Sequence, residues 1–162
     1  MEYHPVVDTI RALLDTHGVW YETFAHEAVR TSEEAAKIRP GYTIDQGAKA
    51  LIARVKSAEN GKHFVMLVLP GSKKFDTKKI KEHLGLSDIR FATEDEVGTI
   101  TGGVLPGGVP PFGNLFELPV YCDQSLFQNE RIVFNAGDKR FSIAMRAEDY
   151  RTLVCPSVAD IA

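Results

Sequence analysis

The sequence predicts a mixed α/β fold, and three observations carry that prediction. Helix-like and strand-like patterns alternate along the 162 residues, as they do in α/β and α+β domains. Residues 63–69 form an uninterrupted apolar run, typical of a central strand covered on both faces. Hydrophobic residues make up 44% and charged residues 25% of the chain, the balance of an ordinary folded domain. We expect one domain spanning 1–162.

The helices are predicted from apolar stripes, capping residues and helix breakers. Pro5 suits a first helical turn, an apolar stripe follows at helical spacing, and Gly18 can end that helix. Thr31 and Glu34 have the spacing of a capping box. The expected helices are 5–17, a short one after Thr31 that ends before Pro40, one from Asp76 to Gly85, one that begins at the capping box of Thr93 and Glu96, and 148–154.

Six or seven strands are predicted from short apolar or alternating runs, with the helices between and around them. Gly and Pro residues bound several of these runs, as at Pro70 and Gly71. The expected strands are 20–25, 46–55, 63–69, 89–92, 119–122, 131–135 and 140–145.

Composition excludes several classes of protein. The net charge of −3 and pI of about 5.9 argue against a general nucleic-acid coat. A local patch at residues 73–81 holds five lysines, which either contact phosphate or form a solvated helix face. Two distant cysteines form no CxxC pair, so neither a disulfide framework nor a zinc site is expected. We expect a cytoplasmic protein, because no signal peptide or membrane-length apolar run is seen.

Lys49 is the first candidate site residue, because it is a charge inside an otherwise apolar strand. Alternate residues of a strand share a face, and both faces of 46–55 are apolar. Lysine is rarely buried without a partner, and desolvation lowers its pKa. The residue either serves a phosphate, a carboxylate or a reaction, or it extends to water from the strand end.

The loop 102–113 is the second candidate, with five glycines and three prolines in twelve residues. Glycines let a backbone approach a ligand and let amides converge on an anion. Such a rigid loop could stabilise an oxyanion. The alternative is a crossover loop with no functional role. The loop matches neither GxGxxG nor a P-loop.

Three weaker candidates lie elsewhere. His26 and Glu27 begin like a zincin motif, but Arg30 stands where the second ligand would be, so no metal is expected. His26 could act in a cleft or be structural, and capping alone explains Thr31. Residues 134–138, which include Asn135 and Gly137, have the composition of a hairpin turn.

Three segments in register resemble one known family. They are His26–Ala36, Gly47–Leu51 and Gly107–Gly113, and they resemble the YbaK and prolyl-tRNA synthetase-associated domain family from about Val6 to Val154. The resemblance implies a curved, barrel-like mixed sheet surrounded by helices. It also implies hydrolysis of the ester of mischarged aminoacyl-tRNA in trans, without a cofactor.

The resemblance also assigns residues. The family's lysine falls on Lys49, and its GxxxP loop falls on Gly107 to Pro111, followed by Phe112 and Gly113. The resemblance therefore implies catalytic roles for Lys49, Gly107, Gly108, Pro111, Phe112 and Gly113, and substrate binding by His26, Thr31, Asn135 and Gly137. Some proline-editing members carry a histidine where this chain has Asn135, which leaves the amino-acid specificity open.

The expected partners are the 3′-terminal adenosine of an aminoacyl-tRNA and a synthetase that supplies it, with no membrane. A monomer or weak homodimer is expected. Two alternative functions remain, a binding module for tRNA or a nucleotide that hydrolyses nothing, and a hydrolase of another small ester.

Overall fold

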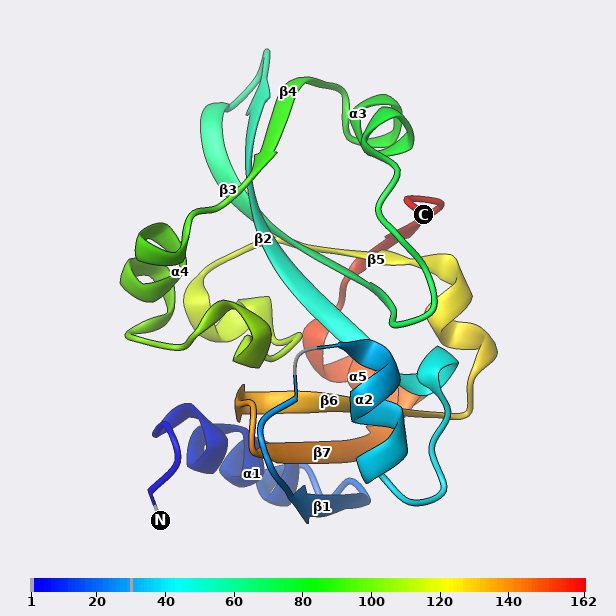
Figure 1. Ribbon diagram of the computed structural model, residues 1–162. Coiled ribbons are helices and arrows are strands. Elements are labelled where there is room, and N and C mark those ends of the chain that lie inside the picture. Colours follow the sequence, from blue (N-terminus) through cyan, green and yellow to red (C-terminus); the bar gives the residue numbers. More distant parts are fainter. Residues whose placement is uncertain (1, 30) are drawn as a thin grey trace.

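The computed structural model describes residues 2–29 and 31–162 and contains, within them, five α-helices and eight strands (Figure 1). Arg30, which stands where a second zincin ligand would be, lies outside the described residues. The helices are α1 (Val6–Thr16), α2 (Ser32–Ile38), α3 (Thr77–Leu84), α4 (Glu94–Thr101) and α5 (Ala147–Val154). The strands are β1 (Tyr21–Ala25), β2 (Ala48–Ser57), β3 (Gly61–Pro70), β4 (Leu86–Phe91), β5 (Val120–Asp123), β6 (Arg131–Asp138), β7 (Phe141–Arg146) and β8 (Ser157–Ala159).

The strands form two open sheets, so the barrel-like sheet that we expected is not confirmed. One sheet has the order β1-β7-β6, and the other has the order β4-β2-β3-β5-β8. An isolated parallel bridge between Gly47 and Val133 joins the sheets where β2 begins. The mixed α/β class is confirmed. The eighth strand, β8, was missed because three residues are too few to show a period.

The predicted helix caps are present. The Thr31 side chain accepts a hydrogen bond from the Glu34 amide at 3.1 Å, and Asp76 accepts from the amides of Lys78 and Lys79 at 3.1 Å each. The Thr93 capping box forms in both directions. Local signals therefore set the starts of α2, α3 and α4.

Strand β2 is covered on both faces, as its sequence predicts. Ala48, Ala50 and Ile52 pack into the larger hydrophobic cluster between the sheets and α1. Ala53 and Val55 belong to a second cluster with residues of β3, α3 and the C-terminal segment. The long strands β2 and β3 connect the two halves of the molecule (Figure 1), which brings the start of β2 to the lower sheet.

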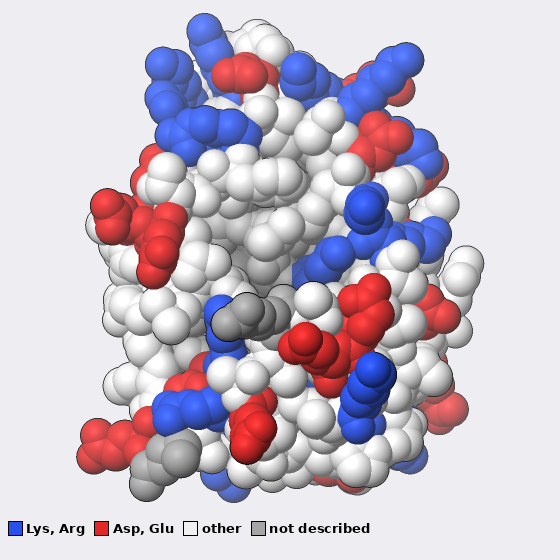
Figure 2. Space-filling view, viewed as in Figure 1, with Lys and Arg blue, Asp and Glu red and all other residues white. Residues whose placement is uncertain are grey.

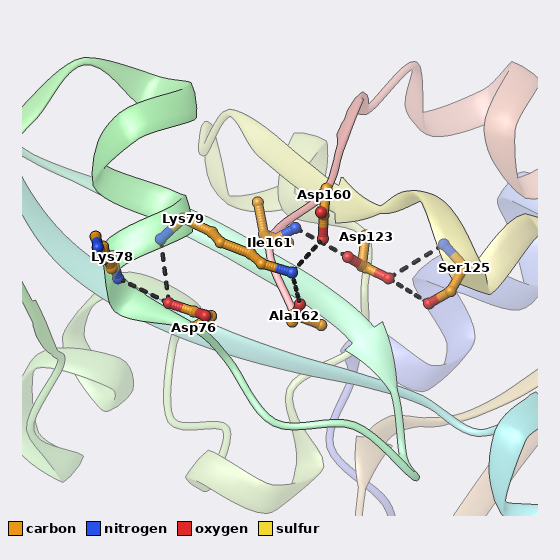
Figure 3. A network of polar contacts seen from close by, with 8 residues as sticks. All are labelled: Asp76, Lys78, Lys79, Asp123, Ser125, Asp160, Ile161 and Ala162. Carbon is orange, nitrogen blue, oxygen red and sulfur yellow. Dashed lines mark hydrogen bonds and ion pairs between the residues drawn. The ribbon is translucent and has the colours of Figure 1, made fainter.

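The C-terminal segment binds α3 and residues 71–76, which precede α3, through hydrogen bonds and an ion pair (Figure 3). Asp123 accepts hydrogen bonds from the Ile161 amide at 2.9 Å and from the Ser125 amide and hydroxyl. Lys79 Nζ reaches Asp160 Oδ1 at 3.1 Å and the Ala162 carbonyl at 2.7 Å. The Asp76 amide donates to the Ile161 carbonyl at 3.0 Å. The 71–76 connection is thereby held beside the start of β2. Within the described residues, no helix has the length and apolar character that crossing a membrane requires.

Candidate functional site

A cavity of about 270 Å³ opens where the two sheets meet, and the face that Figure 2 presents is hollowed near its centre. Its wall comes from α2 and the segment after it, the start of β2, the end of β6, and Pro106, Gly107 and Val109 of the glycine-rich loop. Four of the predicted site residues line this cavity, namely Thr31, Lys49, Gly107 and Asn135. Residues distant in sequence thus meet at one place.

Lys49 lies at the cavity wall, opposite Leu69 of β3. Its ammonium group donates a hydrogen bond to the Lys73 carbonyl at 2.7 Å. Burial lowers the pKa of Lys49, Glu33 works in the opposite direction, and Lys74 adds to the lowering. The side chain is half-buried, and the residue contributes to the cavity wall.

The cavity is electropositive. Arg39, Lys49 and Lys139 line it, and no Asp or Glu among the described residues does so. Arg39 is only 6% exposed, and burial lowers its pKa to about 10, so it stays charged at neutral pH. A cation held in a partly dry site favours an anionic ligand.

Arg39 also fixes the loop at Gly107 through Asn135. Arg39 Nη2 donates to Asn135 Oδ1 at 2.9 Å, and Asn135 Nδ2 donates to the Gly107 carbonyl at 2.9 Å. Arg39 Nε donates to Ser142 Oγ at 3.0 Å. His26 does not line the cavity; its Nε2 lies 2.7 Å from Ser142 Oγ. One polar network therefore connects α2, β6, β7 and the glycine-rich loop.

The rest of the predicted loop residues lie outside the cavity wall. Phe112 is fully buried and packs against Phe134 and Tyr150. The Pro111 carbonyl accepts a hydrogen bond from the Tyr150 hydroxyl at 2.7 Å. A Cβ on Gly113 would lie 2.5 Å from Val120 Cγ2. These contacts anchor the loop in the core, and a catalytic role for these residues stays a prediction.

Gly108 of the loop lies close to Gly137 of β6, and neither residue lines the cavity. A Cβ on Gly108 would lie 3.5 Å from the Gly137 carbonyl carbon. Gly137 has a φ of 111°, and a Cβ there would lie 2.0 Å from Val6 Cγ1 of α1, so glycine is required for packing. A catalytic role for Gly108 and a substrate-binding role for Gly137 stay predictions.

The hairpin turn was predicted in the wrong place. Strand β6 continues to Asp138, with a register irregularity between Asn135 and Asp138, and the turn falls at Lys139 and Arg140. A bulged strand, unlike a loop, aims a side chain firmly. Asn135 is therefore directed at Gly107 by the sheet.

Sequence reasoning missed Arg39, Lys139 and Ser142. Ser142 interrupts the apolar strand β7, the same signal that identified Lys49. Arg39 and Lys139 lie in connecting segments without periodicity, so no local pattern marks them. Within residues 2–29 and 31–162, no group of three or more His, Cys, Asp or Glu is placed to hold a metal ion.

Several known proteins are similar to this chain over most of its length. The family model described as an aminoacyl-tRNA editing domain matches residues 26–153. The multifunctional Ser/Thr-tRNA deacylase ProXp-y of Escherichia coli K12 is 33% identical over 150 residues, which cover 92% of this chain and 88% of that protein. The prolyl-tRNA editing protein ProX of Acetoanaerobium sticklandii is 27% identical over 147 residues, covering 88% and 87%.

A solved structure gives the same result for the fold. The crystal structure of a putative trans-editing enzyme for prolyl tRNA synthetase superposes with a TM-score of 0.81 at 27% identity, covering 99% of this chain and 98% of that one. The three sequence segments, the family match and the superposition all agree, and the chain belongs to the aminoacyl-tRNA editing domain family.

Proposed function

We propose that this protein is an aminoacyl-tRNA deacylase that hydrolyses the ester bond of mischarged tRNA in trans. The observation that carries the proposal is the cavity beside the Gly107 loop. Among the residues that the structure describes, three cations and no carboxylate line it. Such a cavity suits the phosphate-bearing 3′ end of a charged tRNA. Membership of the editing family and the activities for which the relatives are named support the same reaction.

In this proposal, Lys49 anchors the substrate and the Gly107 loop stabilises the reacting carbonyl. The Gly108 amide donates to the Leu105 carbonyl at 2.8 Å and the Val109 amide to the Pro106 carbonyl at 3.4 Å. Prolines 110 and 111 have no amide hydrogen. The Gly107 amide is therefore the candidate oxyanion donor, rather than a nest formed by the whole loop. An aminoacyl ester is already activated, so positioning and electrostatics suffice for attack by water.

We further propose a small, hydroxyl-bearing amino acid as the side chain that is edited. Thr31, Ser32 and Thr43 line the cavity together with small apolar residues. A site that hydrogen-bonds a substrate hydroxyl rejects an analogue without it far more strongly than size alone distinguishes one methylene, which is worth about 1–3 kcal/mol. The name of the Escherichia coli relative, a Ser/Thr-tRNA deacylase, agrees with this choice.

The proposal places a single domain, residues 1–162, in the cytoplasm as a monomer. Its partner is the 3′-terminal adenosine of an aminoacyl-tRNA, with a synthetase as the source of mischarged product. The name of the structural relative, a trans-editing enzyme for a synthetase, supports that source.

A panel of charged tRNAs tests the activity. The purified protein is expected to release serine or threonine from tRNA faster than alanine or valine. Uniform inactivity on the panel would reject the deacylase, and tRNA binding without turnover would favour the binding module. Activity on a free small ester alone would favour the other hydrolase.

The pH dependence tests the anchoring role of Lys49. Its ammonium is the acid form, and burial lowers its pKa, so the charge is lost at a lower pH than in an ordinary lysine. We expect KM to rise as pH increases through that lowered pKa, whereas Lys49→Arg should keep KM constant over the same range. KM is measured from neutral to alkaline pH after subtraction of spontaneous ester hydrolysis. Identical profiles for the two proteins would remove Lys49 as the anchor.

A further inference from the structure

Charge is divided unevenly between two parts of the chain. Residues 48–91, here called the basic region, hold β2, β3, α3 and β4 and carry ten Lys and Arg against four Asp and Glu. Their formal net charge is +6; because the whole chain carries −3, the remaining residues carry −9. Figure 1 places these elements in the upper half of the molecule, except for the start of β2, which reaches the lower sheet. Figure 2 shows Lys and Arg along the upper edge and to the right of the hollow, with Asp and Glu mostly below and to the left.

The strands of the basic region set like charges opposite one another. Lys56 pairs in register with Lys62 on β3, and Arg54 pairs with Arg90 on β4. Like charges directly opposite each other destabilise a sheet. Asp88 lies opposite Lys56 on the other side and Glu96 binds Arg90, but Lys62 is exposed at the hairpin end. An external anion would relieve this repulsion.

Most of these cations are available to a partner. Among residues 2–29 and 31–162, ion pairs engage only Lys79 and Arg90 of the ten. Lys73, Lys74 and Lys78 are exposed. The Lys73 carbonyl accepts a hydrogen bond from the Lys49 ammonium at 2.7 Å, so these cations extend from the cavity along the 71–76 connection to α3.

Resting on the proposed function, we propose that the basic region is the docking surface for the phosphate backbone of the tRNA acceptor stem. A nucleic-acid duplex presents about one negative charge per 1.7 Å of its axis. The basic region attracts that backbone while the acidic remainder repels it, and together they orient the stem. The acylated 3′ end then enters the cavity at Lys49, where the two regions meet.

Two charge-reversal variants test this surface against a matched control. Lys56→Glu/Lys62→Glu alters the β2–β3 hairpin, and Lys78→Glu/Lys81→Glu alters α3. Arg11→Glu/Arg151→Glu is the control, because both arginines are exposed, lie outside the basic region and give the same change in net charge. We expect Kd for uncharged tRNA to rise by about tenfold or more in each test variant, with a weaker salt dependence. The control should change Kd by less than about threefold. Thermal unfolding of all three variants confirms that they are folded.

A short substrate separates this inference from the proposed activity. A trinucleotide that ends in acylated adenosine is too short to reach the outer cations, so the test variants should hydrolyse it at the rate of the parent. If the parent hydrolyses the trinucleotide but the test variants bind tRNA as well as the parent does, the docking surface is rejected and the activity stands. If only the test variants lose tRNA affinity but the parent hydrolyses no ester, the docking surface stands and the activity is rejected. An equal loss of tRNA affinity in the two test variants and the control would show an effect of net charge and would overturn the docking surface.

Discussion

Replacing Lys49 with alanine is expected to lower kcat/KM for aminoacyl-tRNA deacylation by about 10- to 100-fold. The substitution removes one of three cations that line the cavity, and the side chain that reaches the Lys73 carbonyl. A hydrogen bond to a charged group contributes about 1.5–3 kcal/mol, which corresponds to this range of rates. The measurement is hydrolysis of aminoacyl-tRNA at substrate concentrations below KM.

Two further substitutions show whether a loss of activity in Lys49→Ala comes from the missing charge. Lys37→Ala is the matched control, because Lys37 lies on α2 and does not line the cavity; it should retain the activity of the parent. Lys49→Arg keeps a positive charge with a different shape and should lose less than Lys49→Ala. Unchanged binding of uncharged tRNA by Lys49→Ala, together with lost turnover, would assign Lys49 to the reaction site. Full activity of Lys49→Ala would contradict the proposal.

Lys49 shows what a local pattern can predict. A strand that is apolar on both faces has few reasons to carry a charge, and the structure confirms that both faces are covered. The helix caps at Thr31, Asp76 and Thr93 were predictable for the same reason, since each depends on residues within one turn. Local chemistry therefore identified the elements and one wall of the cavity.

The other features of the fold and of the site depend on contacts between residues that are distant in sequence. The extent of the five-stranded sheet is set by the parallel pairing of β3 with β5 and of β5 with β8, which no local period encodes. Phe112 illustrates the same limit. The family resemblance implied a role for Phe112 at the site, and this role stays a prediction. The packing of its side chain in the core against Tyr150 could not be predicted from a local pattern. Arg39 was missed because its importance comes from residues about one hundred positions away.

Arg39 and Asn135 are expected to act as one unit in positioning the Gly107 loop. Arg39→Met removes the donors to Asn135 and Ser142, and Asn135→Ala leaves the Gly107 carbonyl without its side-chain donor. Arg39→Met removes a hydrogen bond from the buried Ser142 and one from the half-buried Asn135, and a buried polar group that loses its partner costs about 1–3 kcal/mol, so this variant should lose about 5- to 100-fold in kcat/KM. The Gly107 carbonyl is exposed and can accept a hydrogen bond from water, so Asn135→Ala should lose less, through release of the loop. Because Arg39 acts on the Gly107 carbonyl through Asn135, the double variant should lose little more activity than the more impaired of the two single variants.

The double-mutant cycle separates positioning from general destabilisation. Arg11→Met, on the exposed face of α1, is the control, and its effect should multiply with that of Asn135→Ala. Arg39→Lys keeps the charge at the cavity but lacks the fork that reaches both Asn135 and Ser142. It should therefore retain a KM close to that of the parent while kcat falls, whereas Arg39→Met should impair both. Multiplicative losses from Arg39→Met and Asn135→Ala would show that the two residues act separately. In that case Arg39 would serve only as a cavity cation, and the bulged end of β6 alone would hold Asn135 against the loop.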